Sequence, residues 1–374
     1  MLQFMDGNDA MVLGALDAGC DFFAGYPITP ATSILLKMIQ ELPPRGGTVI
    51  QGEDEIASIG FCIGASCAGR RALTATSGPG LSLYSENIGM ALMMEVPLVI
   101  VVVQRQGPAT GSATNVAQGD VQFARWVTSG GMPMVVLAPS TAEECYTFTM
   151  RAFDIAETLR MPVVILSDKE LAMTRTRVDL DDLKKVPVRG RKMFAGTSPF
   201  KAYDLARPED IPPFAKFGGD KVVRITTSSH DDNAYITKDV KAISRFIEHF
   251  QAKVDTRQKE LTFVSEDLQA GAKVLLVSYG ITARSSLKAT HLLREKGVKV
   301  SHLNIHTLWP VPEEVIRKSA EGAELVAVPE LNMGLYRREL ERILCGKKVI
   351  GINRMDTQLI SPQDIVAEVE HALG

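Results

Sequence analysis

The chain has 374 residues, of which 45% are hydrophobic and 23% charged, and its net charge is -3. This balance is ordinary for a soluble globular protein of two or three domains, and it gives no indication of nucleic acid or an anionic membrane as a partner. No apolar run approaches the roughly 20 residues of a membrane span, and the start lacks a basic segment followed by an apolar one. We therefore expect no membrane segment, no secretory signal and a cytoplasmic location.

The five cysteines are spread along the chain, and the closest pair, Cys62 and Cys67, has C-x4-C spacing. Iron–sulfur and zinc sites within one chain usually need closer pairs such as C-x-x-C. We therefore expect no cluster or zinc ion held by this chain alone. The cysteines are predicted to be buried free thiols in a reducing compartment.

Residues 1–180 alternate short apolar runs with helical stretches. Continuous Val, Ile and Leu without polar alternation is typical of parallel strands that are buried on both faces. With helices between them, the runs predict an α/β domain with a doubly wound parallel sheet. The runs lie at residues 21–24, 48–50, 73–75, 98–103, 135–137 and 163–166.

Residues 181–270 have a different character, with five prolines, charged stretches and the pair Gly218-Gly219. A short strand at 222–225 and a charged helix near 238–260 are predicted within this segment. A connection of this length is unusual in a compact domain, so we expect it to wrap over a neighbouring part of the chain or over a partner.

From residue 271 the alternation resumes and predicts a second, smaller α/β domain over residues 271–374. Its strands are predicted at 273–278, 298–303, 324–328 and 348–350, with helices near 283–296 and 313–320.

Ligands of open parallel sheets lie at the carboxyl ends of the strands, so the residues after each strand are the first candidates. The segment 25–30, GYPITP, follows the first run. Its two prolines make a stiff loop suited to hold the Thr29 hydroxyl against a carboxylate or carbonyl. On local features alone, a plain rigid loop before a helix is the simpler interpretation.

The segment 51–55, QGEDE, follows the second run and opens a helix rich in small residues. Gly60 and Gly64 share one face of this helix and permit the close approach of another backbone. Three acids at a helix start also suit the helix dipole, so charge compensation alone would explain them.

Two further segments follow the third and fourth runs. The segment 76–80, TSGPG, is a glycine-rich turn that matches neither G-x-G-x-x-G nor the P-loop, although such turns bring backbone N–H groups to a ligand. The segment 104–108, QRQGP, follows the most apolar run. The fork of Arg105 matches the two oxygens of a carboxylate, and the alternative is an arginine that reaches out to solvent.

In this order and spacing, the four segments resemble the α subunit of 2-oxoacid:ferredoxin oxidoreductases, thiamine-diphosphate enzymes that act on pyruvate, 2-oxoglutarate or 2-oxoisovalerate. The resemblance covers nearly the whole chain. It identifies residues 1–180 with the pyrimidine-binding domain of the family. Residues 271–374, which contain VPELN at 328–332, are similar to its transketolase C-terminal domain.

The resemblance implies roles for individual residues. Glu55 matches the glutamate that hydrogen-bonds N1′ of the aminopyrimidine and so assists removal of the thiazolium C2 proton. Glu53 is the competing assignment, and Glu55 is preferred because it is in register with the small-residue helix. Thr29 and Arg105 match the residues that bind the carboxylate of the 2-oxo acid. Ser77 and Gly78 belong to the implied cofactor-binding turn.

The sequence departs from the family's diphosphate and Mg²⁺ pattern, which needs Gly-Asp-Gly followed later by Asn. Gly119-Asp120 is followed by Val121, and Gly219-Asp220 by Lys221. The resemblance therefore implies a β subunit that supplies the diphosphate site, Mg²⁺ and a [4Fe-4S] cluster, with no metal ion on this chain. A separate γ chain and a ferredoxin-like δ chain are further expected partners, together with ferredoxin.

The implied reaction is the oxidative decarboxylation of a 2-oxo acid with CoA to acyl-CoA, CO₂ and reduced ferredoxin. We expect 2-oxoglutarate as substrate, because residues 107–111, GPATG, are similar to that subgroup. Residues 118–120 are closer to the branched-chain subgroup, so 2-oxoisovalerate and pyruvate remain alternatives. Two other classes stay open: a non-redox thiamine lyase or transketolase-like enzyme, and a non-catalytic assembly subunit. His230 is interpreted as structural, with a contact near the partner or the active site as the alternative.

Overall fold

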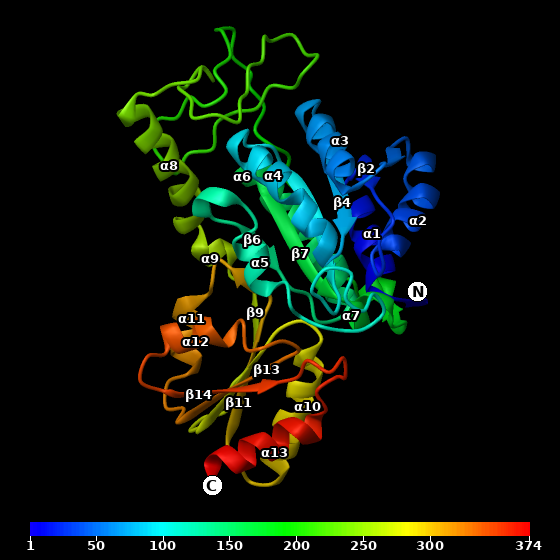
Figure 1. Ribbon diagram of the computed structural model, residues 1–374, viewed down its shortest axis with the longest axis vertical. Coiled ribbons are helices and arrows are strands. Elements are labelled where there is room, and N and C mark those ends of the chain that lie inside the picture. Colours follow the sequence, from blue (N-terminus) through cyan, green and yellow to red (C-terminus); the bar gives the residue numbers. More distant parts are fainter.

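The computed structural model describes residues 1–374, and its two larger sheets follow one another along the length of an elongated molecule (Figure 1). We call the seven-stranded sheet with its helices unit 1 and the five-stranded sheet with its helices unit 2. None of the helices combines the length and the apolar character that a membrane span requires.

The sheet of unit 1 has the order β12-β6-β7-β5-β4-β2-β3, and every neighbouring pair is parallel except β12 with β6. Its strands are β2 (Phe22–Gly25), β3 (Thr48–Gln51), β4 (Ala72–Thr76), β5 (Leu98–Gln104), β6 (Val135–Leu137), β7 (Pro162–Asp168) and β12 (Thr307–Trp309). Each apolar run predicted in residues 1–180 forms a strand of this sheet, and the predicted doubly wound fold is confirmed.

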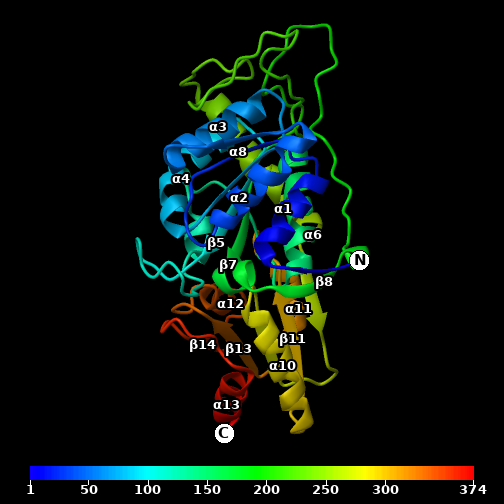
Figure 2. The same ribbon diagram turned by 90° about the vertical axis from the view of Figure 1, so that its right-hand side faces the viewer.

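Helices cover both faces of this sheet (Figure 2). On one face α3 packs against α4, and on the other α1 packs against α2 and α6. The bounds are α1 (Gly7–Asp17), α2 (Thr32–Glu41), α3 (Glu55–Cys67), α4 (Gly78–Met93), α5 (Val121–Arg125), α6 (Ala142–Leu159) and α7 (Lys169–Met173). Because both faces are covered, β5 is buried along its whole length, and its continuous apolar sequence follows from that burial.

The sheet of unit 2 has the order β14-β13-β10-β11-β9, with β9 antiparallel at one edge and the other neighbours parallel. Its elements are β9 (Val264–Asp267), β10 (Val274–Ser278), α10 (Thr282–Glu295), β11 (Val300–Ile305), α11 (Glu313–Ser319), β13 (Leu325–Glu330), α12 (Arg337–Ile343), β14 (Lys348–Asn353) and α13 (Pro362–Leu373).

Four short strands were not expected from the sequence. β1 (Leu2–Met5) and β8 (Thr176–Asp179) pair only with each other, and β9 is an edge strand of the sheet of unit 2. β12 lies within residues 271–374 of the sequence but pairs with β6 in the sheet of unit 1. Their partners lie far away along the chain, so local patterns do not reveal them. The division at residues 180 and 270 stays a prediction, and β12 shows that the two units interlock across it.

The long connection wraps over the end of unit 1 that lies away from unit 2 (Figure 1). The predicted strand at 222–225 is wrong, because these residues pair with no other strand and Val222 is 92% exposed. The predicted charged helix is confirmed as α8 (Val240–Asp255) followed by α9 (Gln258–Leu261).

A buried charge cluster fixes α8 and the connection to unit 1. Glu95 accepts a hydrogen bond from Lys253 Nζ at 3.1 Å and lies 3.0 Å from His249 Nε2, while Arg160 donates to the Pro212 carbonyl at 3.0 Å. All four charged or titratable side chains are buried. Burial by itself would raise the pKa of Glu95, but attraction to Lys253 and His249 outweighs it and lowers that pKa.

We expect Glu95→Ala to lower the free energy of unfolding by about 3–5 kcal/mol, because it leaves buried cations without a counter-charge. Glu313→Ala is the control, since Glu313 pairs with Arg342 at the surface and should contribute less than about 1 kcal/mol. Chemical denaturation measures both variants. The pKa of Glu95 is lowered on folding, so this stabilisation should be present at neutral pH and lost as the pH falls below about 4. An equal decrease in the free energy of unfolding of the two variants would contradict the prediction.

Candidate functional site

The carboxyl ends of β2, β3, β4 and β5 meet at one edge of the sheet, because these four strands are parallel. This edge faces unit 2, since residues that follow β4 and β5 share a cavity with residues that follow β13. The four segments singled out in the sequence are therefore gathered at one place. They carry Thr29, Glu55, Ser77 with Gly78, and Arg105.

Glu55 and Glu53 differ in their surroundings. The side chain of Asp54 caps α3 by accepting a hydrogen bond from the Ala57 N–H at 2.7 Å, which leaves Glu55 as the first helical residue. Glu55 is 7% exposed, whereas Glu53 is exposed to solvent. Since Asp54 already serves the helix dipole, charge compensation does not account for a buried Glu55.

The glycine-rich turn brings the first turn of α4 against two carboxyl groups. A Cβ at Gly80 would collide with Thr76 Oγ1 and lie 2.8 Å from Glu55 Cγ. A Cβ at Gly78 would lie 2.8 Å from Asp120 Oδ2. Both glycines are therefore required by the close approach of these groups, and no side chain separates the α4 backbone from either carboxyl.

Arg105 ties two loops of the site together. Its Nη1 donates to the Thr29 carbonyl at 2.6 Å and its Nη2 to the Thr110 carbonyl at 3.0 Å. Arg105 is 8% exposed, so the alternative of a side chain that reaches out to solvent is wrong. Its Nε is buried and has no partner within the chain. The structure thus places Arg105 beside Thr29 and leaves the Nε–H of the guanidinium without a partner.

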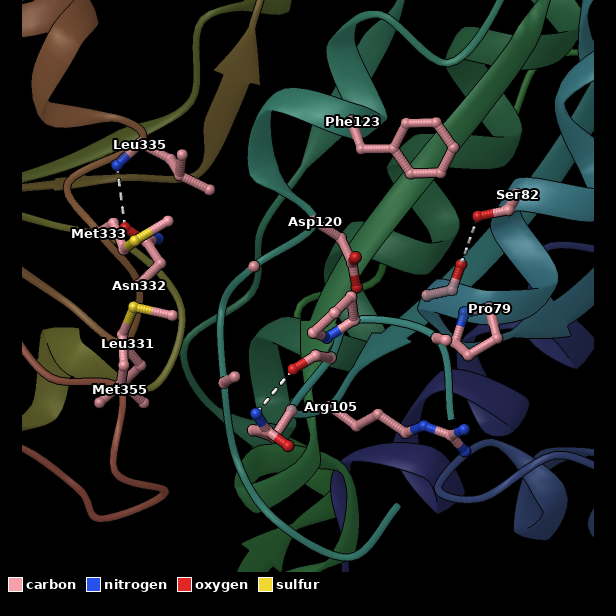
Figure 3. A pocket seen from close by; sticks show the side chains of 17 residues that line it. Pro79, Ser82, Arg105, Asp120, Phe123, Leu331, Asn332, Met333, Leu335 and Met355 are labelled. Carbon is pink, nitrogen blue, oxygen red and sulfur yellow. Dashed lines mark hydrogen bonds between the residues drawn. The ribbon is translucent and has the colours of Figure 1, made fainter. Parts of the chain in front are cut away.

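A cavity of about 490 Å³ lies between the two units at this edge (Figure 3). Gly78, Arg105 and Asp120 line it from unit 1, and Leu331 and Met333 line it from unit 2. Thr29, Glu55 and Ser77 do not line this cavity, although they follow neighbouring strands. Sequence reasoning named Asp120 only in an incomplete Gly-Asp-Gly pattern and residues 328–332 only as a family similarity, and it assigned neither to this site.

Gln118 connects the loop that follows Arg105 to unit 2. Its N–H donates to the Leu331 carbonyl at 2.9 Å, and its Oε1 accepts from the Leu331 N–H at 3.2 Å. The Asn332 side chain donates to the Gln118 carbonyl at 2.8 Å, and Gln118 Nε2 donates to the Tyr279 carbonyl at 3.3 Å. Gln118 is completely buried, so these bonds form without competition from water.

His230 and the cysteines lie outside this site. His230 is in the connection, where it stacks on Tyr203 with ring centroids 3.8 Å apart, and burial lowers its pKa. The structure does not bring it to the strand ends, and a contact with a partner stays a prediction. Four of the cysteines are buried as expected, but Cys345 is exposed. No group of three or more His, Cys, Asp or Glu side chains is arranged to hold a metal ion.

We expect Gln118→Ala to loosen the loop between Arg105 and Asp120, because it leaves the Leu331 N–H buried without a partner. The Tyr279 carbonyl would lose one of its two donors and keep Thr282 Oγ1 at 2.8 Å. A buried N–H without a partner costs about 1–3 kcal/mol, so the free energy of unfolding should fall and amide hydrogen exchange in residues 106–117 should accelerate. Gln122→Ala is the matched control. Gln122 also bridges the units, through the Leu335 carbonyl at 3.0 Å, but it lies on α5 outside the loop. Unchanged loop exchange in Gln118→Ala would refute the role of this contact.

Comparison with known proteins places this geometry in context. Two family models match the chain: "Pyruvate flavodoxin/ferredoxin oxidoreductase, thiamine diP-bdg" over residues 13–248, and "Pyruvate:ferredoxin oxidoreductase core domain II" over residues 272–365. The 2-oxoglutarate synthase subunit KorA of Methanothermobacter thermautotrophicus is 37% identical over 366 residues, which are 97% of this chain and 96% of that protein. The ketoisovalerate oxidoreductase subunit VorB of Methanothermobacter marburgensis is 32% identical and covers 100% of this chain and 98% of its own length.

A solved structure shares the fold of the whole chain. It is the 2-oxoglutarate:ferredoxin oxidoreductase from Magnetococcus marinus with 2-oxoglutarate, coenzyme A and succinyl-CoA bound, at a TM-score of 0.94 and 31% identity. The match covers 100% of this chain but 65% of that one, so the present chain spans about two thirds of the length of that solved relative.

Proposed function

Because the chain belongs to the pyruvate:ferredoxin oxidoreductase family, we propose that it is the α subunit of a thiamine-diphosphate-dependent 2-oxoacid:ferredoxin oxidoreductase. The proposed reaction is the oxidative decarboxylation of a 2-oxo acid with CoA to acyl-CoA, CO₂ and reduced ferredoxin. The observation that carries the proposal is the buried carboxyl of Glu55 at the strand-end edge of unit 1, at the same edge as the linked loops of Thr29 and Arg105.

The residues at this edge fit the aminopyrimidine of thiamine diphosphate. Glu55 is buried, and Gly80 keeps the first turn of α4 in contact with its side chain, so the carboxyl has a fixed place. Ser77 and Gly78 belong to the same turn and are the further proposed cofactor contacts. When bound, thiamine diphosphate supplies the centre that stabilises the carbanion formed on loss of CO₂. Glu55 would hold a proton at N1′ of the pyrimidine.

Arg105 and Thr29 are proposed to bind the carboxylate of the 2-oxo acid. Two nitrogens of the guanidinium already donate to loop carbonyls, and the buried Nε–H remains free for an acceptor. A charged donor that is shielded from water binds an anion more strongly than an exposed one. We propose 2-oxoglutarate as the substrate, since a relative at 37% identity is a 2-oxoglutarate synthase subunit and the ketoisovalerate relative is 32% identical.

We propose that the diphosphate, Mg²⁺ and [4Fe-4S] sites belong to a β subunit, with separate γ and ferredoxin-like δ chains and ferredoxin as further partners. The absence of Gly-Asp-Gly at residues 119–121 and 219–221 supports a second chain for the diphosphate.

Glu55→Gln in the complex with its partner subunits should lower kcat/KM for viologen reduction by about 100-fold or more, because a neutral amide does not hold the proton at the pyrimidine. Glu53→Gln is the matched control, since Glu53 lies two residues away and is exposed. It should leave kcat/KM near the wild-type value. Full activity of Glu55→Gln would exclude the proposed cofactor role, and the reverse pattern would favour Glu53.

A panel of 2-oxo acids tests the substrate. We expect kcat/KM for 2-oxoglutarate to exceed that for 2-oxoisovalerate and pyruvate by about tenfold or more, because a site that pairs a second carboxylate discriminates against acids without it. Equal or faster turnover of 2-oxoisovalerate would identify the branched-chain subgroup instead. Turnover without an electron acceptor would indicate a non-redox thiamine enzyme, and normal turnover after replacement of Glu55, Thr29 and Arg105 by alanine would indicate an assembly subunit.

A further inference from the structure

Two residues beside the cavity, Asp120 in its lining and Ser77 next to the lining residue Gly78, occupy helix N-cap positions without capping their helices. Ser77 precedes α4 and Asp120 precedes α5, and neither side chain accepts a hydrogen bond from its helix. A side-chain cap contributes typically about 1 kcal/mol. Elsewhere in the chain the N-cap Asp or Ser does accept such a bond, at Asp6, Asp54, Asp168, Asp239 and Ser361. Positions where a side chain does not make the hydrogen bond that the local structure favours are expected at functional sites.

The side chains of Ser77 and Asp120 each end in a buried oxygen that has no hydrogen-bond partner within the chain. Ser77 Oγ and Asp120 Oδ2 are both shielded from solvent and make no hydrogen bond within the chain, and Ser77 is 0% exposed. Unsatisfied buried polar atoms are rare in native proteins and cost about 1–3 kcal/mol each. Two of them at one place indicate a missing partner group.

Ser77 and Asp120 both adjoin Gly78, the first residue of α4. Gly78 follows Ser77 directly, and both carboxyl oxygens of Asp120 lie within 2.9 Å of the position that a Gly78 Cβ would take. Asp120 and Gly78 also line the cavity between the units (Figure 3). A ligand in this cavity therefore has access to Gly78 at the start of α4 and to the Asp120 carboxyl beside it.

The charge of Asp120 limits which chemical groups of a ligand can bind beside it. Burial raises the pKa of Asp120 to about 6, against an opposing effect of Arg105, so the side chain is mainly a carboxylate at neutral pH. A carboxylate only accepts hydrogen bonds, and it repels an anion. Ser77 can donate or accept. The matching group is therefore neutral or cationic and carries an N–H or O–H.

We propose that Asp120 and Ser77 form a polar subsite that binds an N–H-bearing group of a ligand in the proposed reaction. The identity of the ligand rests on the proposed function. The 2-oxo acid is an anion without a donor and does not suit Asp120. The amino group of the thiamine pyrimidine and the amide N–H groups of the CoA arm share the required chemistry. Glu55 and Asp120 adjoin the same turn of α4, at Gly80 and Gly78.

The test uses the complex with its partner subunits and three variants, Asp120→Ala, Asp120→Asn and Ser77→Ala. Equilibrium titrations give the Kd of thiamine diphosphate for the cofactor-free complex and the Kd of CoA for the loaded one. Asp120→Ala should raise one of these values by about tenfold, the effect of one charge-assisted hydrogen bond, and thereby identifies the source of the N–H group. Ser77→Ala should raise the same Kd by a smaller factor. The KM of the 2-oxo acid should not rise.

Asp168→Asn is the matched control. Asp168 is also buried at the carboxyl end of a strand, and burial raises its pKa to about 6 as well, but its oxygens accept from the Leu171 and Ile281 N–H groups. This variant should lose stability without a change in either Kd. In the wild type, the Kd that depends on Asp120 should rise as the pH falls through about 6. Asp120→Asn should abolish that rise.

The outcomes separate this inference from the proposed function. If the wild-type complex binds both ligands and the Asp120 and Ser77 variants bind them equally well, the subsite is refuted and the proposed function stands. If Asp168→Asn changes the same Kd as Asp120→Ala, the effect is a structural one and the subsite is also refuted. A wild-type complex that binds neither thiamine diphosphate nor CoA overturns the proposed function together with this assignment.

Discussion

The first turn of α4 touches two carboxyl-bearing side chains, Glu55 at Gly80 and Asp120 at Gly78, and the geometry of the site depends on these contacts. A methyl group at either glycine would overlap its neighbour, so either the turn or the side chain of Thr76, Glu55 or Asp120 would have to move. The same turn contributes Ser77 and lines the cavity between the units. The glycines are thus required because a backbone and two acidic groups occupy one small volume.

The segments at the two ends of the sheet of unit 1 are held by different kinds of interaction. At the carboxyl ends of the strands, loops are held by a few specific hydrogen bonds, such as those of Arg105 to Thr29 and of Gln118 to Leu331. At the opposite end, the connection is fixed by buried ion pairs around Glu95. Residues that bind ligands often lie on loops that a rigid scaffold positions, and the two sets of contacts hold the loops and the connection on such a scaffold.

The sequence predicted the parallel sheets well because buried strands carry a local signal, a continuous apolar run between helical stretches. The prediction from sequence failed where a segment becomes a strand only by pairing with a distant strand. Residues 222–225 are apolar enough for a strand but find no partner, whereas β12 has three residues and exists only because it meets β6. Strand formation at the sheet edges is therefore a property of contacts between distant segments and not of the local sequence.

The sequence by itself determined which segments follow the strands, and hence that Thr29, Glu55, Ser77, Gly78 and Arg105 come to one edge. Order along the chain and parallel topology are sufficient for that. The tertiary structure alone decided that Glu55 is buried while Glu53 is exposed, that Asp120 turns into the cavity, and that unit 2 forms its second wall. The contact between Gln118 and Leu331 joins residues more than 200 positions apart. Burial and pairing of this kind arise only when the two units fold against each other.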